Sequence, residues 1–463
     1  MTAPQEVRAV PWQAEARVSA VQKRTVRLLA AAQVVGGVGI GVSVSIGSLL
    51  AESVARSEAY AGLARTAMTA GAAAVGIPLA LLAQRRGRRA ALSTGWLTAA
   101  VGGGLLIASA VLTSISLLVV GMLLFGVGSA TNQQSRYAAA DLAAPLHRAR
   151  ALSIVVWATT LGSLIGPNLA DPGAWVASVL RLPPLTGAFV LAALCMALAS
   201  LLLWAGLRPD PLVLARRQAN AAGQANAAGQ ANAAGPANAA GQGNAAGPPG
   251  AGSRVHAAPR GPAEARDPRS GTVRTALRHL RRSPRAAFAF VSIVVAHTTM
   301  GVIMTMTPVS MSEDGAALTV VGITISGHLL GMYALSPVVG WLADRVGHLP
   351  VAVAGQAVFL TSALLSGLSH GSVALMMTGL FLLGLGWSFS LVAGSAMLTE
   401  ATPTADRPSV QGTTDTAMYV VAAMGAGLAG PLMHSFGFGG LNAAAAALVL
   451  PVMLFWLRLA RSR

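Results

Sequence analysis

The sequence predicts an all-α membrane protein with twelve transmembrane helices in two pseudo-symmetric six-helix bundles. Three observations lead to this prediction. The 463 residues are 54% hydrophobic and only 10% charged, whereas soluble domains carry about 25% charged residues. The apolar residues come in repeated blocks of about 20, the length at which a helix crosses a bilayer. Several landmarks also recur in the second half of the chain at a nearly constant spacing.

The first bundle is predicted to cover residues 28–207, after a polar cytoplasmic tail at residues 1–27. Its apolar blocks predict helices at about 28–50, 61–83, 90–112, 115–138, 151–171 and 184–207. The second bundle is predicted to cover residues 286–457, before a short basic tail at 458–463. Its helices are expected at about 286–309, 319–342, 349–369, 373–398, 409–432 and 438–457.

A low-complexity segment separates the bundles. Residues 208–285 contain a six-residue repeat of the ANAAGQ type that begins at Ala219. The repeat lacks apolar residues large enough to form a core, which predicts a disordered cytoplasmic linker; a structured repeat array is the alternative. The basic stretch RTALRHLRR at 274–282 is expected to lie as a helix on the membrane surface.

The net charge of +17 would suit a nucleic-acid-binding protein, but its distribution indicates a membrane instead. All Lys and Arg residues except Arg56, Arg65 and Arg181 fall on one side of the predicted helices. The positive-inside rule makes that side cytoplasmic, which predicts a multi-pass protein of the cytoplasmic membrane with both termini inside. The expected partners are the lipid bilayer and a small-molecule or ion substrate, with no nucleic acid. The single cysteine, Cys195, excludes a disulfide within the chain.

Three pairs of landmarks relate the two halves. The segment AQRRG at 83–87 matches ADRVG at 343–347, an offset of 260 residues. Asp141 and Arg148 match Glu400 and Arg407 at an offset of 259, and Gly166-Pro167 matches Gly430-Pro431 at 264. Such constancy indicates two homologous parallel halves, with a substrate site expected at their interface. One chain then holds both halves, and a monomer is expected.

The segment GWLADRVGH at 340–348 resembles the G-x-L-x-D-R-x-G-R loop signature of the major facilitator superfamily. The first-half copy departs from this pattern, since Gln84 replaces the aspartate and Ala80 the first glycine. Gly162-x-x-x-Gly166-Pro167 is similar to a signature of the drug–proton antiporter branch. The resemblance implies a secondary transporter that moves a small organic compound or drug by alternating access, with proton coupling and in that branch efflux. It implies neither an enzyme nor a cofactor.

Charged residues around these loops are expected to form ion pairs that hold one conformation and break in the other. The expected pairs are Arg85 with Asp141, Arg345 with Glu400, and Asp344 with Arg407; Arg148 corresponds to Arg407 in the first half. The alternative is that these are ordinary solvated loop charges. Gly162 and Gly166 are expected to permit close helix packing, and Pro167 to bend its helix.

Polar groups inside the predicted helices are the candidates for function, because their burial in lipid costs free energy. Asp415 is the leading candidate for proton coupling, with His297 and His328 as further candidates. The alternatives are that Asp415 lies at a helix start near the interface and that Arg136 reaches the headgroups. Candidate substrate-binding residues are Gln33, Asn132, Gln133, Arg136, Asn168, His297, Met300, Met304, His328 and Met332, and Gln134 and Gln411 are further buried polar candidates.

A second resemblance concerns Met300-x-x-x-Met304 and His328-x-x-x-Met332, which are similar to motifs of CcoA-type bacterial copper importers. That resemblance implies a metal site at these four residues, and thioethers and imidazoles do suit Cu(I). The alternative is that the methionines fill an apolar core or line an organic-ligand site. A membrane sensor that has kept the fold without transport is a further alternative. The absence of a nucleotide-binding G-x-x-x-x-G-K-[ST] motif argues against an ATP-driven pump, and no nucleophile–base–acid set indicates an enzyme.

Overall fold

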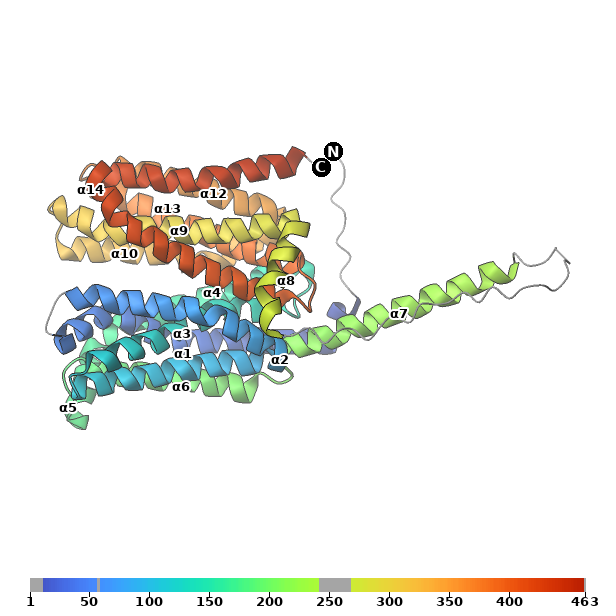
Figure 1. Cartoon of the computed structure of the whole chain (residues 1–463), viewed down its shortest axis with the longest axis horizontal. Helices are drawn as coiled ribbons and strands as arrows, with labels where there is room; N and C mark the ends of the chain where they lie inside the picture. The colour runs from blue at the N-terminus through green and yellow to red at the C-terminus, as the bar shows by residue number, and fades with distance from the viewer. Residues whose placement is uncertain (1–10, 56–58, 241–267, 462–463) are drawn as a thin grey trace.

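The structure is a computed structural model that describes residues 11–55, 59–240 and 268–461 (Figure 1). The first half contains α1 (Ala16–Ala55), α2 (Ala59–Val111), α3 (Ile115–Ala140), α4 (Arg148–Ile165), α5 (Ala170–Leu180) and α6 (Thr186–Gly206), with 3-10 turns at Pro11–Ala14, Pro145–His147 and Gly166–Leu169. Two helices follow between the halves, α7 (Pro211–Ala240) and α8 (Pro268–Arg282). The second half contains α9 (Pro284–Glu313), α10 (Leu318–Tyr333), α11 (Ser336–Val346), α12 (His348–Gly367), α13 (Val373–Glu400) and α14 (Arg407–Arg461).

These helices make twelve transmembrane segments, which we call crossings. Nine stretches of the described residues are long and apolar enough to span a membrane. The stretches Thr66–Val111 and Arg407–Leu459 each hold two crossings, because Gly87 (φ 88°) and Gly437 (φ 67°) interrupt their helices with a backbone that favours glycine. The shorter α4 is the remaining crossing. The predicted fold class is thereby confirmed.

Local sequence signals fix several helix starts. The hydroxyls of Ser114, Ser283 and Ser372 precede α3, α9 and α13 and accept hydrogen bonds from backbone N–H groups in the first turn. Pro284 follows Ser283 at the first helical position, where its missing N–H costs nothing. These caps place the ends of the helices that carry the candidate site.

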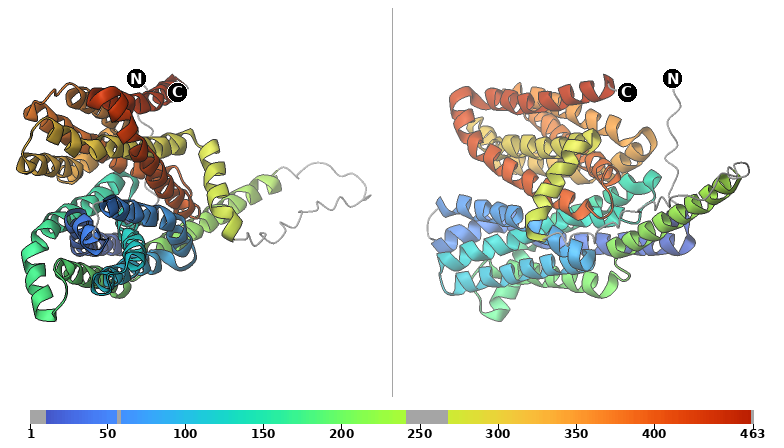
Figure 2. Two further views of the ribbon diagram at one scale, coloured as in Figure 1. Left: turned by 60° about the vertical axis from the view of Figure 1, so that its left-hand side comes forward. Right: turned by 45° about the vertical axis from the view of Figure 1, so that its right-hand side comes forward.

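The two halves lie side by side, the first coloured blue to green and the second yellow to red (Figure 1). Two further views show the same separation (Figure 2). One apolar core fills the first half around Leu29 and Trp96. A second core fills the other half and extends across the seam to Tyr137 and Leu152. The halves therefore share buried contacts as well as having cores of their own.

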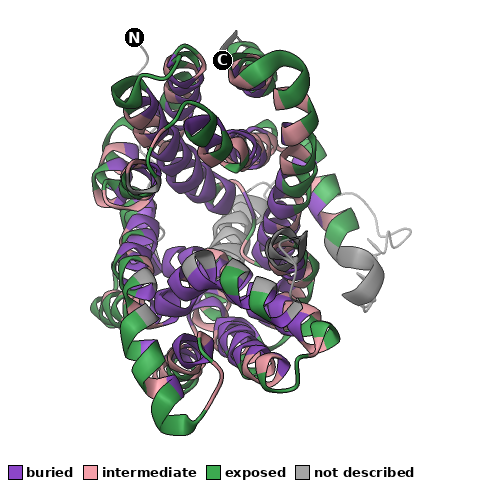
Figure 3. Cartoon of the chain, turned by 90° about the vertical axis from the view of Figure 1, so that its left-hand side faces the viewer, coloured by how far each residue is buried: buried purple, intermediate pink, exposed green. Residues whose placement is uncertain are grey.

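The outer surface of the bundle is apolar. Buried residues face inward and exposed ones lie on the perimeter when the bundle is viewed along its helices (Figure 3). Large apolar side chains on that perimeter include Leu194 (61% exposed), Val338 (58%) and Leu454 (59%). Such a broad apolar surface suits contact with lipid.

The structure differs from the sequence prediction outside the crossings. Helix α1 begins at Ala16, inside the predicted polar tail of residues 1–27. Helix α7 covers Pro211–Ala240 and projects from the bundle, where the repeat predicted disorder (Figure 1). Its alanines favour a helix, although the Asn and Gly residues and Pro236 of the same stretch do not. The rest of the repeat, at residues 241–267, lies outside the described residues. The basic stretch at 274–282 is helical, as predicted, and forms the end of α8.

Both halves place their basic loops at the same end of the bundle. We name this the arginine-rich end; it carries Arg85–Arg89, Arg148, Arg345, Arg407 and the arginines of α8. Helix α7 projects from this end, at the right of Figure 1. Distances along each helix from this end give the depth of a residue in the bundle, at about 1.5 Å per residue.

Candidate functional site

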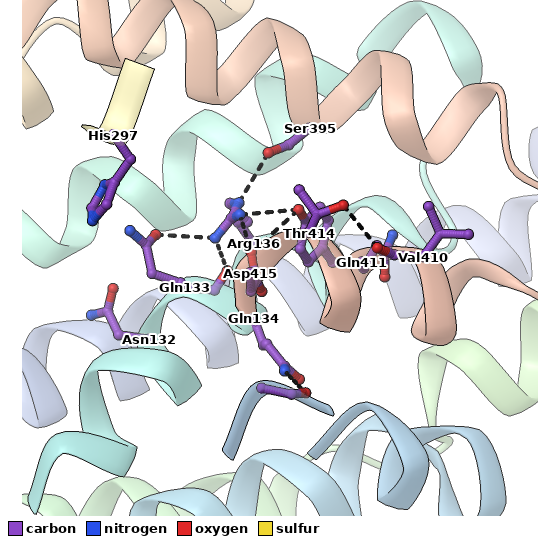
Figure 4. A network of polar contacts seen from close by, with 12 residues as sticks. Asn132, Gln133, Gln134, Arg136, His297, Ser395, Val410, Gln411, Thr414 and Asp415 are labelled. Atoms are coloured by element: carbon purple, nitrogen blue, oxygen red, sulfur yellow. Dashed lines mark hydrogen bonds and ion pairs between the residues drawn. The ribbon is translucent and has the colours of Figure 1, made fainter. Parts of the chain in front are cut away.

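A buried ion pair joins the two halves. Arg136 lies four residues before the end of α3, and Asp415 lies eight residues into α14. Arg136 Nη2 and Asp415 Oδ1 are 2.7 Å apart, and the two side chains are 1% and 0% exposed. Arg136 also donates from Nε to the Ser395 hydroxyl of α13 over 3.0 Å, a second bond across the seam (Figure 4).

The burial of this pair decides between the alternatives left open by the sequence. Both side chains are enclosed between the halves, so neither is solvated at a helix end. The Oδ2 atom of Asp415 is buried without a hydrogen-bond partner among the described residues. Removing one charge from a buried pair costs about 3–5 kcal/mol. A proton on Asp415 would likewise cancel its charge and weaken the bond that joins the halves.

A second ion pair lies closer to the arginine-rich end. Arg88 Nε and Asp141 Oδ2 are 2.8 Å apart, and both side chains are buried. Arg88 also donates from Nη2 to Gln411 Oε1 over 2.5 Å, which links the first half to α14. The prediction that Asp141 binds Arg85 was wrong, because the partner of Asp141 is Arg88. The break at Gly87 turns the chain, so that Arg88 begins the next crossing facing inward while Arg85 is exposed.

The Asp344 carboxylate caps a helix of the other half. Its Oδ1 and Oδ2 accept hydrogen bonds from the backbone N–H groups of Ala149 and Arg150, each over 2.9 Å. These amides have no partner within α4 because they lie in its first turn, where the helix dipole also favours a negative charge. Asp344 therefore joins the halves, but through α4 and not through Arg407.

The other expected loop pairs also find different partners. Glu400 accepts a hydrogen bond from Nδ1 of His348 over 3.0 Å. The guanidinium of Arg345 lies 5.3 Å from the ring centroid of Trp341. Arg407 is buried and donates from Nε to the carbonyl oxygens of Thr399 and Thr402. The corresponding first-half arginine, Arg148, is 4% exposed at the start of α4.

The hydrogen bonds that join the two halves, made by Arg136, Arg88 and Asp344, all lie toward the arginine-rich end. Asp415 is about 12 Å from that end of its helix and Arg136 about 6 Å. Gln84, which replaces the aspartate of the first-half loop, accepts a bond from Ser409 of α14 over 3.4 Å. Small residues bring the backbones together here, since a Cβ on Gly340 would lie 2.2 Å from the Ser153 hydroxyl. The halves are therefore closed at the arginine-rich end.

An aromatic cluster lies deeper in the second half. The indole N–H of Trp387 donates to Nδ1 of His297 over 3.0 Å. The ring centroids of His297 and Tyr419 are 5.5 Å apart, and those of Tyr333 and Trp387 are 5.6 Å apart. The four residues come from α9, α10, α13 and α14, each 12 or 13 residues from the arginine-rich end of its crossing. This places them at about 18–20 Å, near the middle of a bilayer.

The sequence singled out only His297 from this cluster. Tyr333, Trp387 and Tyr419 occur in apolar blocks, where aromatic side chains read as ordinary core residues. The available signal was their similar distance from the predicted helix ends, which places them at nearly one depth.

Amide side chains of the first half form hydrogen bonds next to Arg136. Gln33 donates from Nε2 to the Asn132 carbonyl over 3.0 Å, and Asn132 donates from Nδ2 to the Thr159 hydroxyl over 3.3 Å. Gln133 accepts a bond from Arg136 over 3.0 Å. In Figure 4, Asn132, Gln133 and His297 lie to the same side of Arg136. Two amides of the first half and the His297 ring of the second thus lie on one side of the buried ion pair.

Several predicted site residues lie elsewhere. Asn168 is exposed and donates to the Leu164 carbonyl of its own turn, so it is not part of this region. Gln134 is buried and donates to the Gly76 carbonyl over 2.9 Å. His328 donates from Nδ1 to the Leu380 carbonyl of α13 over 2.9 Å. Among the described residues, no group of three or more His, Cys, Asp and Glu side chains is arranged to hold a metal ion.

The methionines of the proposed copper motif belong to the second-half core. Met332 is 6% exposed within that core, and Met300 and Met304 are half-buried against it. This placement fits the packing alternative as well as a ligand wall.

Glycines bring α1 and α4 into contact. A Cβ on Gly162 would lie 2.3 Å from the Val34 carbonyl oxygen, and one on Gly166 would lie 2.4 Å from the Gly41 Cα. Helix α4 ends at Ile165, and a 3-10 turn follows over Gly166–Leu169, which contains Pro167. Backbone atoms occupy the space that a Cβ would need at both glycines, so a change of side-chain rotamer could not relieve the clash.

Replacing Gly162 with alanine is therefore expected to destabilise the protein by about 1–3 kcal/mol through overpacking. Gly104 supplies a matched control, because its Cβ would meet nothing within 4 Å. Gly104→Ala should leave the thermal unfolding midpoint of the purified protein unchanged or slightly raised, while Gly162→Ala lowers it. Equal midpoints for the two variants would contradict the packing described here.

Comparisons with known proteins agree with this architecture. The sequence matches the family model described as Major Facilitator Superfamily over residues 29–309 and 289–463. It is similar to two uncharacterized MFS-type transporters of Bacillus subtilis (strain 168): YdeG, 33% identical over 421 residues (91% of this chain, 88% of the relative), and YddS, 31% identical over 440 residues (94% and 91%). It is also 25% identical over 420 residues to the riboflavin transporter RfnT of Brucella anthropi, covering 91% of this chain and 92% of RfnT.

Two solved structures share the fold. The human organic anion transporter MFSD10 (TETRAN) superposes with a TM-score of 0.67 at 16% identity, covering 94% of this chain and 99% of that one. The proton:xylose symporter XylE, bound to 6-bromo-6-deoxy-D-glucose, gives a TM-score of 0.67 at 16% identity, covering 95% and 96%. At these identities the likeness concerns the arrangement of the helices.

Proposed function

This chain belongs to the major facilitator superfamily, and from that premise we propose that it is a proton-coupled secondary transporter of a small organic solute. The observation that carries the proposal is the Arg136–Asp415 ion pair, buried between the halves below an aromatic cluster. Alternating access requires contacts that join the halves in one state and break in another. A buried ion pair with a protonatable member meets that requirement.

We propose that the arginine-rich end faces the cytoplasm, as the positive-inside rule favours. With that end closed, alternating access requires the region around His297 and the amides to open to the outside. Protonation of Asp415 then weakens its bond to Arg136, and the halves separate at the cytoplasmic end. This cycle is compatible with transport in either direction. Because one chain supplies both halves, a monomer is sufficient for it.

The chemistry around His297 favours a flat organic substrate with polar edges. Trp387 and Tyr419 are 1% and 8% exposed in this closed conformation, and we propose that movement of the halves uncovers their ring faces for stacking. The amides of Asn132 and Gln133 would then supply donors and acceptors. Riboflavin, named for the relative RfnT, is a flat heteroaromatic compound of this kind and belongs among the first compounds to test.

Copper import has less support. The Nδ1 atom of His328 is engaged by the Leu380 carbonyl, and that of His297 by the Trp387 indole. A Cu(I) site on Met300 and Met304 would have to draw on the remaining imidazole nitrogens. The carbonyl contact at Nδ1 leaves Nε2 of His328 as the atom that would bind the metal, and copper stays the second candidate.

The proposal is tested with purified protein in liposomes that carry an imposed pH gradient. Flat heteroaromatic compounds, including riboflavin, are offered together with copper, and accumulation is measured. We expect a heteroaromatic compound to accumulate, and Trp387→Ala to lower its uptake at least tenfold. Trp204→Ala is the matched control, since Trp204 is 53% exposed on the outer surface. Uptake of copper alone would favour a copper importer. Absence of uptake for every compound would favour a membrane sensor that does not transport.

A further inference from the structure

Helix α8 lies across the seam between the halves. It packs against α9 and α14 of the second half and also contacts α2 of the first. Figures 1 and 2 show it at the arginine-rich end, beside the ends of these helices. Ala276 and Leu280 form its buried side, and His279 donates from Nε2 to the Ala401 carbonyl over 2.9 Å. The helix is therefore anchored and presents a defined outer face.

That outer face combines apolar and cationic side chains. Val273 is 41% exposed and Leu277 46%, and these residues are four apart on one stripe. Arg274, Arg278 and Arg281 are also exposed. The sequence of α8, PRSGTVRTALRHLRR, contains no Asp or Glu. Apolar side chains interleaved with arginines are typical of a helix that lies in the headgroup region of an anionic membrane.

A small pocket opens beside this face. Thr275, Arg278, His279 and Arg282 line it together with Asp406 from the loop before α14. Arg278 and Arg282 are one turn apart, so both guanidinium groups can reach one phosphate. The hydroxyl of Thr275 adds a donor, and the two arginines outweigh the single acid. The pocket thus has the chemistry of a phosphate site at the depth of lipid headgroups.

We propose that α8 binds an anionic phospholipid, with the headgroup phosphate at Arg278 and Arg282 and acyl chains against Val273 and Leu277. This site lies outside the region proposed for the transported solute. Because α8 contacts both halves while the arginine-rich end is closed, a lipid that holds it there also favours the closed state. Anionic lipid is then a regulator of the transport cycle.

The test compares nanodiscs of phosphatidylcholine with and without phosphatidylglycerol, and measures retained phosphatidylglycerol by native mass spectrometry. We expect Arg278→Gln/Arg282→Gln to weaken retention roughly 10- to 30-fold, from the contribution of two basic residues at an anionic surface. Lys23→Gln/Arg24→Gln removes equal charge from exposed positions of α1 and should leave retention unchanged. Leu277→Asn, which leaves the arginines intact, should also weaken it.

Equal retention by the two double variants would overturn the proposal. Displacement of the lipid by millimolar inorganic phosphate would also overturn it, in favour of a soluble anion as the ligand. A conformational measurement is made with spin labels on Arg86→Cys and Arg345→Cys, exposed in opposite halves, after Cys195→Ser. Phosphatidylglycerol should increase the short-distance population at this end, and an unchanged distribution would contradict the regulatory role.

Discussion

Replacing Arg136 with methionine is expected to abolish transport and to lower the free energy of unfolding by about 3–5 kcal/mol. The substitution leaves the Asp415 carboxylate, which is 0% exposed, without the cation that compensates it. The stability loss should appear as a lower thermal unfolding midpoint, and the transport loss in the liposome assay. Arg345→Met is the matched control, because it removes an exposed arginine at the same end and should change neither.

A double substitution separates folding from function at this pair. Arg136→Met/Asp415→Leu removes both charges and should recover most of the lost stability, since an apolar pair of similar volume avoids the desolvation cost. It should remain inactive, because no group then takes up the proton. A double variant that is no more stable than Arg136→Met would show that the pair does not act as described.

Joining the halves at the arginine-rich end is expected to stop transport. The side chains of Gln84 and Ser409 meet across the seam, with 3.4 Å between Oε1 and Oγ. In a Cys195→Ser background, Gln84→Cys/Ser409→Cys treated with a short bifunctional thiol reagent should lose at least nine tenths of its uptake. Because alternating access opens this end in each cycle, adding a reductant to a cleavable cross-link should restore uptake.

The control for this experiment lies within one half. His348 and Glu400 also meet at the arginine-rich end, with 3.0 Å between Nδ1 and Oε2, but both belong to the second half. The same treatment of His348→Cys/Glu400→Cys should leave the uptake of that variant as it was before the reagent. Full uptake by cross-linked Gln84→Cys/Ser409→Cys would mean that the two halves need not separate there.

The sequence was sufficient for the crossings, because hydropathy depends on residues that lie along one helix. It also drew attention to Arg136 and Asp415, since a charge inside an apolar block is conspicuous. Their pairing was beyond it, because α3 and α14 are 279 positions apart at these residues and only the packing of the halves brings them together.

Two errors have a physical origin that the sequence only partly records. Arg85 and Arg88 stand in one basic run, and the choice between them depends on the turn at Gly87. The repeat after Ala219 lacks a core-forming face, which predicted disorder, yet its alanines favour a helix over Pro211–Ala240. The aromatic cluster was not predicted, because Tyr333 and Trp387 meet only through tertiary packing. Aromatic residues in an apolar helix do not by themselves indicate a functional site.

Substrate-driven proton movement through Asp415 is the central claim, and it can be measured directly. Protein is reconstituted in liposomes with a pH-sensitive dye inside, and the compound identified by the uptake panel is added without an imposed gradient. The account predicts a change in internal pH with the native chain and none with Asp415→Asn, while binding of the compound remains measurable in both. Equal uptake by the native chain and Asp415→Asn, with no pH change in either, would contradict it.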